Sequence, residues 1–446
     1  MQGLIMAGQL ILGLSILVTL HELGHFLAAR AFGIKVEKFY LFFDAWGFKL
    51  FSFKIGDTEY GMGWLPLGGY VKIAGMVDES LDTEQLAAEP QPWEFRAKPA
   101  WQRLIVMVGG VTMNVILGII IFSGTLLQFK KDYLPNQEVI QGKGIYAYKL
   151  GKEIGLQDGD KILTINGNSF ERFEDVLSSR VLFGATLSIE RNNRTMEVVV
   201  PDNFYRKVGE AGRWSFVGYG PLHHYQIRSV ADGEPAQKAG LQLGDKITAI
   251  NGEIIASNDD LVNKIGALKN KTVTLNILRD NQLITLQSAV TNKGTIGISY
   301  DAIPEKNSSY KMEPYTVSNA VSFGTSDAIE ALVSNAKGLG KIFTGEEKAS
   351  ESVQGPIGIA TIYGGVWDWS RFWAITGLLS MVLAFMNMLP IPALDGGHVI
   401  FLLIESIFKV KFSDKVMERA QVVGMVILFS LLIFAVGNDI WKHILH

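Results

Sequence analysis

The sequence predicts a multi-pass α-helical membrane protein with a duplicated α+β region inserted between its second and third spans. Three observations predict this fold class. Of the 446 residues, 48% are hydrophobic, which is a high share for a soluble protein. Four apolar stretches reach or approach the roughly 17–25 residues that cross a ~30 Å hydrocarbon core. In addition, a 13-residue segment recurs 85 positions further along the chain.

The four apolar stretches cover residues 4–29, 104–127, 372–394 and 422–437. The first carries no charge before His21, so a secretory signal peptide is an alternative to a retained span. That stretch lacks a basic segment at its start and a small-residue cleavage site. We therefore expect all four stretches to form transmembrane helices.

Lysine and arginine residues near the span ends predict the orientation, because cytoplasmic loops carry an excess of them. They follow the first span, precede the second, and lie between the third and fourth: Arg30, Lys35, Lys38, Arg96, Lys98, Arg103, Lys409, Lys411, Lys415 and Arg419. We expect these loops to face the cytoplasm. Both termini and the long segment 130–370 then lie on the outer side of the membrane.

Charge and cysteine content exclude several classes of site. The 41 basic and 44 acidic residues nearly balance, and no long basic run indicates a surface for nucleic acid. The chain contains no cysteine, so it has neither disulfides nor thiolate metal ligands. Any metal ion must be held by histidine, aspartate or glutamate.

The repeat lies in the outer segment. "GLQDGDKILTING" at 155–167 matches "GLQLGDKITAING" at 240–252 in ten of thirteen positions. Each copy reads as a Gly-Asp turn, a short apolar strand and an Asn-Gly turn. A helix-like stretch and a pair of alternating strands follow in both copies. The pattern predicts two related α+β domains.

The end of the first span holds the motif His21-Glu22-Leu23-Gly24-His25, or H-E-x-x-H. Positions four apart share one face of a helix, so both imidazoles can bind one zinc ion, with Glu22 as general base toward water there. An ionisable residue at membrane depth costs roughly 2.5–3.5 kcal/mol, which metal coordination offsets for the two imidazoles. The alternative is a polar helix end that snorkels to the interface.

A catalytic zinc usually has three protein ligands and an open position, so one ligand remains to be found. Asp395 follows the third apolar stretch, where Pro390 and Pro392 break the helix and the Gly-Gly pair after Asp395 allows a sharp turn. His398 is a competing ligand, which we rank below Asp395. An ordinary turn at the end of a span is the alternative reading of this stretch.

These motifs resemble one known family. HELGH in the first span, "NMLPIPALDGGH" at 387–398, four spans and the duplicated insert are together similar to the site-2 proteases, specifically the bacterial regulator-of-sigma-E protease (RIP metalloprotease) group. The two repeats resemble tandem PDZ domains of the permuted bacterial type, with "GEPAQKAGLQLGD" at 233–245 as the clearer signature. The first copy lacks the Pro-Ala of that signature, so a peptide groove and a spacer role both stay open for the pair.

The resemblance implies roles for individual residues. His21, His25 and Asp395 would hold Zn²⁺, Glu22 would be the catalytic base, and Asn387 would contact the substrate near the scissile bond.

Further substrate contacts are implied more weakly. "YGMGWLPLGGYVKIAG" at 60–75 looks like the family's membrane re-entrant β-hairpin, with Gly68, Gly69 and Tyr70 at the substrate, although an ordinary cytoplasmic hairpin is an alternative. Asn114 matches the last position of a "GPxxN" element that lacks its proline in this chain.

The implied function is an intramembrane zinc metalloendopeptidase of a bacterial inner membrane, with both termini and the PDZ-like domains in the periplasm. It would cut transmembrane segments of single-pass proteins, such as membrane-bound anti-sigma factors or remnant signal peptides, after a site-1 type protease has trimmed them. Its other partner is membrane lipid, and none is nucleic acid. A non-catalytic PDZ scaffold and a metal transporter are the alternatives.

The expected domains follow from these assignments. Residues 1–128 would hold the first two spans, the zinc motif and the re-entrant hairpin. PDZ-like domains would occupy 129–220 and 221–306. An amphipathic membrane-surface segment would cover 307–371, and the last two spans with the Leu-Asp-Gly motif would cover 372–446.

Overall fold

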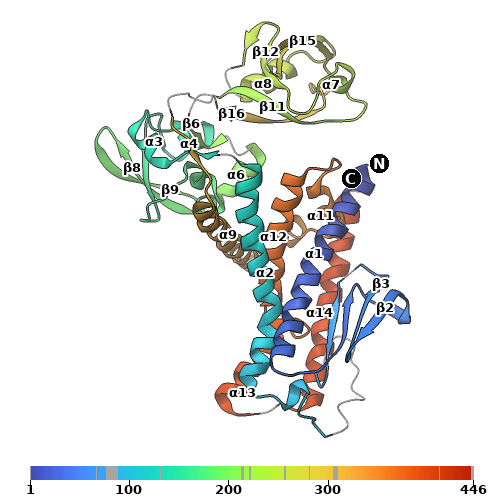
Figure 1. Cartoon of the computed structure of the whole chain (residues 1–446). Helices are drawn as coiled ribbons and strands as arrows, with labels where there is room; N and C mark the ends of the chain where they lie inside the picture. Colours follow the sequence, from blue (N-terminus) through green and yellow to red (C-terminus); the bar gives the residue numbers. More distant parts are fainter. Residues whose placement is uncertain are drawn as a thin grey trace. The chain divides into compact units, whose positions relative to one another are not determined.

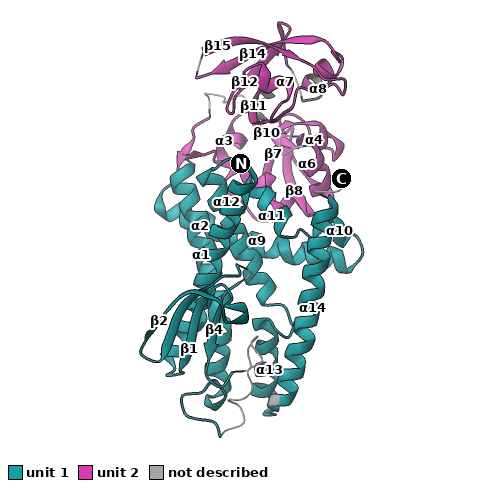
Figure 2. Ribbon diagram, turned by 90° about the vertical axis from the view of Figure 1, so that its right-hand side faces the viewer, with its two compact units in different colours: residues 1–131, 315–446 teal, residues 132–314 magenta. Residues whose placement is uncertain are grey.

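The computed structural model divides the chain into two compact units, residues 1–131 with 315–446 and residues 132–314 (Figure 2). Lys411, counted above for the orientation, and Leu67 of the 60–75 stretch lie outside the residues that the structure describes. The described residues are 2–66, 68–76, 89–130, 132–211, 215–219, 222–255, 258–280, 282–304, 310–410 and 412–442.

Four long helices dominate the first unit. They are α1 (Gln2–Ala31), α2 (Ala100–Phe129), α12 (Trp369–Asn387) and α14 (Asp414–Ile440). Each is long and apolar enough to cross a membrane, which confirms the prediction of four membrane-length helices. The first residues of α1 and the last of α14 lie at the same end of these helices (Figure 1).

The third span ends earlier than the sequence pattern predicted. Helix α12 stops at Asn387, an irregular loop occupies residues 388–394, and α13 (Asp395–Phe408) begins at the aspartate. Prolines remove backbone donors and clash with a continuing helix, so the apolar run through Leu394 cannot be one helix. The loop therefore brings Asp395 to the start of a new helix.

Small residues set the helix packing. A Cβ atom at Gly24 of α1 would overlap the Gly109 carbonyl of α2, and one at Gly118 of α2 would overlap Met381 of α12. Membrane helices depend on such close approaches, since lipid gives them no hydrophobic drive to associate.

Two further helices pack on the bundle, one against α2 and one against the C-terminal end of α14. The expected amphipathic segment contains α9 (Val317–Phe343), which starts with a capping box of Thr316 and Asn319 and packs its Gly324 against Ser123 of α2. After the short α10 (Ala349–Ser352), α11 (Pro356–Tyr363) begins where the buried Asp439 carboxylate accepts the Gly355 and Gly358 backbone N–H groups at 3.0 and 2.9 Å.

A four-stranded sheet follows α1. Its strands are β1 (Val36–Leu41), β2 (Lys49–Ile55), β3 (Thr58–Gly63) and β4 (Tyr70–Ile73), in the order β2-β3-β1-β4. The expected hairpin within 60–75 is wrong in its pairing, because β1 lies between β3 and β4 and bonds to both. The actual hairpin is β2 with β3, and β4 is left as an edge strand.

Short 3₁₀ turns flank this sheet, η1 (Ala45–Gly47) before β2 and η3 (Phe95–Ala97) before α2.

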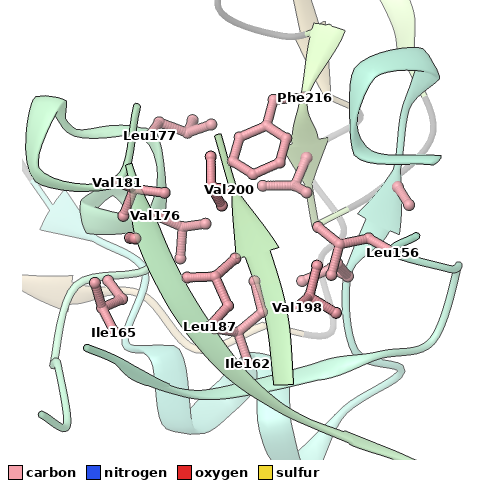
Figure 3. Packing of buried hydrophobic residues seen from close by; sticks show 14 of the residues in the cluster. Leu156, Ile162, Ile165, Val176, Leu177, Val181, Leu187, Val198, Val200 and Phe216 are labelled. Atoms are coloured by element: carbon pink, nitrogen blue, oxygen red, sulfur yellow. The ribbon is translucent and has the colours of Figure 1, made fainter. Parts of the chain in front are cut away.

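The second unit contains two lobes, each with its own hydrophobic core. Figure 3 shows the first core, in which Leu156, Ile162 and Leu187 pack with Phe216. Around it lie a three-stranded antiparallel sheet β7-β8-β9 and short helices. The elements of this lobe are β5 (Asp132–Tyr133), α3 (Asn136–Gln141), β6 (Tyr146–Ala147), α4 (Lys149–Glu153), β7 (Lys161–Ile165), η4 (Phe173–Leu177), α5 (Ser179–Leu182), β8 (Ala185–Arg191), β9 (Arg194–Val200), α6 (Phe204–Ala211) and β10 (Val217–Gly218).

The second lobe has the strand order β15-β14-β12-β11-β16, with β13 paired to β12. Its elements are β11 (Leu222–Val230), α7 (Pro235–Lys238), β12 (Lys246–Ile250), β13 (Glu253–Ile254), α8 (Asn258–Gly266), β14 (Thr272–Arg279), β15 (Gln282–Ala289) and β16 (Ile298–Pro304). The chain then returns to the first lobe, where Tyr310 and Met312 join its core and β17 (Glu313–Pro314) pairs with β5. The second lobe is thus inserted into the first. Residues 310–314 belong to the first lobe rather than to the expected segment 307–371.

The sequence repeat is also a structural repeat. Asp160 and Asp245, each 1% exposed, accept bonds from an arginine, Arg191 or Arg279, that also binds a turn carbonyl, of Gly155 or Gly240. In each lobe the asparagine of the Asn-Gly turn, Asn166 or Asn251, adopts a positive φ. Its side-chain oxygen accepts a backbone N–H near the start of the neighbouring strand, from Thr186 of β8 or Thr274 of β14. The repeated segment therefore forms the same turn in both lobes. Its aspartate also makes the same ion pair with an arginine in both, which we call the clamp.

We predict that Asp245→Asn destabilises the second lobe by about 2–3 kcal/mol, since hydrogen bonds to a buried charged group are lost. Amide hydrogen exchange of β12 and β14 in the full chain measures this. Glu253→Gln, which changes an exposed ion pair with Lys264 in the same lobe, is the matched control and should leave exchange unchanged. Equal protection in both variants would contradict the clamp.

Candidate metal centre

Three of the predicted site residues meet at one point. Nε2 of His21 lies 3.2 Å from Nε2 of His25, and Oδ2 of Asp395 lies 3.3 Å from the first and 3.4 Å from the second. The histidines are on the last turns of α1, and Asp395 is the first residue of α13. Among the described residues, this is the one group of three His, Asp or Glu side chains with metal-binding spacing.

The geometry fits a zinc ion. Ligands that bind zinc tetrahedrally at ~2.0–2.2 Å lie about 3.3–3.6 Å from one another, close to the three distances here. Oδ2 of Asp395 is buried and has no hydrogen-bond partner among the described residues. A buried carboxylate oxygen without a donor is costly, and a cation between it and the imidazoles satisfies it.

The second ring nitrogens of the histidines contact α2. Nδ1 of His25 lies 2.8 Å from the Val106 carbonyl, which only accepts hydrogen bonds, so Nδ1 carries the proton and Nε2 keeps its lone pair. Nδ1 of His21 lies 3.1 Å from the carboxamide of Asn114, whose Oδ1 has no partner. Turning that oxygen toward the ring would fix His21 in the same way. Asn114 is fully buried behind His21 rather than facing a substrate.

Gly110 of α2 makes room for the two imidazoles. A Cβ atom there would overlap Nε2 of His25 and Cε1 of His21. The helix backbone therefore forms a wall directly against the rings.

Asp395 is held by a compact loop. Ala393 has a φ of 80°, a strained value for a residue with a side chain, and Cβ atoms at Gly396 or Gly397 would overlap carbonyls of residues 388–391. A partly buried ion pair of Arg103 on α2 with Glu405 on α13 connects the helix that begins at Asp395 to the helix behind the histidines.

A cavity of about 400 Å³ opens on the three ligand atoms. Glu22 and Asn387 line it, and the Asn387 amide nitrogen lies 3.2 Å from Nε2 of His21. Gly69 and Tyr70 of the sheet also line it, whereas Gly68 is not among its lining residues and packs on Phe43. His398 borders the cavity without joining the three metal-spaced atoms.

Sequence reasoning missed a polar cluster on the sheet side of this cavity. The Tyr70 hydroxyl donates to Asp44 at 2.9 Å, and Nζ of Lys38 lies 3.4 Å from both Asp44 and the Tyr70 oxygen. Burial, and then the bond to Asp44, raises the pKa of Tyr70, so it stays a donor. Asp44 falls in the stretch "FYLFFDAWGFKLFSF" at 39–53, where no motif marked it as a site residue.

An H-E-x-x-H helix that shares a cavity with a distant carboxylate, within a set of membrane-length helices, defines a membrane-embedded metallopeptidase centre. Comparison with known proteins agrees. The pattern of peptidase family M50 matches residues 9–431, and the chain belongs to this family, which confirms the resemblance drawn from its motifs.

Individual relatives match along almost their whole lengths. A Vibrio cholerae protein whose name contains the words "zinc metalloprotease" is 28% identical over 96% of this chain and 97% of its own length. The "Regulator of sigma E protease" of Haemophilus influenzae is 27% identical over 97% and 98%. The "Protease RseP" of Yersinia pestis is 27% identical over 96% and 97%.

We predict that Gly110→Ala lowers the affinity for a divalent metal at least ~10-fold, because the methyl group displaces the ligating rings. Metal content of the purified protein after dialysis against graded free zinc measures this. Gly124→Ala is the control, since a Cβ atom at this position of the same helix meets nothing within 4 Å. Equal metal content in the two variants would show that α2 does not confine the rings.

Proposed function

We propose that the protein is a zinc-dependent intramembrane endopeptidase. The observation that carries the proposal is the convergence of His21, His25 and Asp395 at 3.2–3.4 Å in a cavity shared with Glu22, with both histidines inside a membrane-length helix. Zinc as the metal is supported by this donor set and by the name of the Vibrio relative.

The proposed chemistry divides the work among four side chains. Bound zinc, held by His21, His25 and Asp395, supplies Lewis-acid polarisation of water and the peptide carbonyl. Glu22 takes a proton from the attacking water and delivers it to the leaving amine. The Asn387 amide, beside the ligand atoms, donates to the oxygen that gains charge as water adds to the carbonyl.

The substrate must be extended at the cut, because a helix hides its peptide bonds in its own hydrogen bonds. Strand β4 lines the cavity and is an edge strand, so its outer N–H and C=O groups can pair with an unwound segment. Gly69 and Tyr70 would contact that segment, while Gly68 supports the turn before them. The sheet would enter the membrane beside α1, as the resemblance implied for residues 60–75.

The relatives' names support a substrate class. The Haemophilus protein is named for sigma E regulation, which is consistent with a membrane-bound anti-sigma factor as the protein that is cut. We propose single-pass proteins of this kind as substrates, together with remnant signal peptides. A separate site-1 type protease would trim each substrate first. The membrane is a bacterial inner membrane.

The second unit would admit only trimmed substrates. Its two lobes, the first of which includes residues 310–314, would be the PDZ-like domains, and they would lie in the periplasm with both termini. Helix α9 would lie at the membrane surface, consistent with its exposed apolar residues Val317, Val321 and Ile329. The basic residues beside the opposite ends of the spans support this orientation.

We predict that Glu22→Gln lowers the turnover of a tagged single-pass substrate by about 10²–10⁴-fold while zinc content is retained. A zinc chelator should stop cleavage by the wild type, and added zinc should restore it. Purified protein in detergent with a gel readout measures both effects. Cleavage that is insensitive to the chelator and to Glu22→Gln would refute a zinc peptidase.

Replacing each of the two asparagines that contact His21 should lower activity for a different reason. Asn387→Leu should lower kcat about 10²–10³-fold with zinc retained, since it removes a donor at the reacting oxygen. Asn114→Leu should weaken zinc binding about 10–100-fold and recover activity in excess zinc, since it removes a partner of a ligating ring. Titrations of activity against free zinc separate these outcomes, and identical curves for both variants would contradict the assignment.

A further inference from the structure

One polar side chain of the cavity has no part in the chemistry described so far. Gln421 lies on α14, within the fourth membrane-length helix, and is 3% exposed. It is the one polar side chain between positions 420 and 429 of the sequence. The neighbouring side chains Val422, Val423, Val426 and Ile427 are exposed and apolar, as lipid-facing positions are.

The position of Gln421 follows from the packing of α14 on the loop before Asp395. A Cβ atom at Gly424 would overlap the Pro392 carbonyl, so the glycine lets α14 approach the loop closely. Gln421 lies three residues before Gly424 and therefore on the same face of the helix. That face borders the cavity, which Gln421 lines together with Leu394 and Asp395.

The carboxamide of Gln421 makes no hydrogen bond within the part of the chain that the structure describes. Because the residue is only 3% exposed and lines the cavity, its amide can find a partner from outside the protein only there, and polar groups inside membrane helices are usually functional. Its position on the wall of the cavity makes a bound molecule the natural partner.

We infer that Gln421 binds the backbone of the substrate segment that unwinds for cleavage. This inference rests on the proposed function. A primary carboxamide offers one donor group and one acceptor, the same pair that an extended residue presents along its edge. Strand β4 can pair with one edge of an extended segment, and Gln421 lies on a different wall of the same cavity. The helix thus supplies a partner for backbone groups that β4 leaves unpaired. Gln421 is a substrate-positioning residue that acts without regard to substrate side chains.

The test pairs an enzyme variant with substrate backbone changes. Gln421→Met keeps the side-chain length and removes both polar groups, and it should lower kcat/KM roughly 3- to 10-fold, the effect of one or two hydrogen bonds. The substrates are single-pass peptides in which one amide near the cleaved bond at a time is replaced by an ester. For the wild type, one ester position should cost a similar factor that disappears in Gln421→Met, while the other ester positions keep their cost.

Each outcome decides a separate point. Undiminished kcat/KM in Gln421→Met, or an unchanged cost of every ester, overturns the role of Gln421. Gln128→Leu, at an exposed position of α2, controls for loss of an amide elsewhere in a span. Equal zinc content in all variants excludes misfolding as the cause of a loss. Gln421→Asn retains the amide and should keep part of the activity that Gln421→Met loses. Chelator-insensitive cleavage by the wild type would instead refute the proposed peptidase itself.

Discussion

The close contact of α1 with α2 is the constraint on which the rest of the membrane unit depends. A Cβ atom at Gly24 would overlap the backbone of Gly109, and a Cβ atom at Gly110 would overlap both imidazoles. Because the helices touch, the Val106 carbonyl reaches one ring and the Asn114 amide reaches the other. The same absence of side chains that lets the helices pack therefore orients the two imidazoles.

The third side chain of the proposed metal site, Asp395, follows a loop that its prolines make irregular. The loop 388–394 contains two prolines and a strained Ala393, and it is held between α13 and Gly424 of α14. Met388 and Pro390 of this loop are exposed, whereas Ala393 is buried. Strain at Ala393 is therefore stored in the packed part of the loop, two residues before Asp395.

Local patterns in the sequence predicted much of this arrangement. Helical spacing put His21 and His25 on one face, and the Pro-rich run before Asp395 indicated a break in the third span. The repeated segment predicted the two turns, and the strand between them, in each of the two lobes. Contacts that depend on tertiary register were beyond such patterns: β1 between β3 and β4, the bond from Tyr70 to Asp44, and the burial of Asn114 behind His21. No periodicity records which strand lies next to which, or which side of a ring an amide contacts.

The pairing of β5 with β17 means that the chain leaves the membrane unit and returns to it through two hydrogen-bonded strands. In topological terms, all of the second unit is an elaborated loop of a short hairpin between α2 and α9. Such a loop can lengthen, duplicate or be exchanged while the helices it joins keep their neighbours. The peptidase unit and the second unit can therefore change as separate modules, because the connection between them is one pair of short strands.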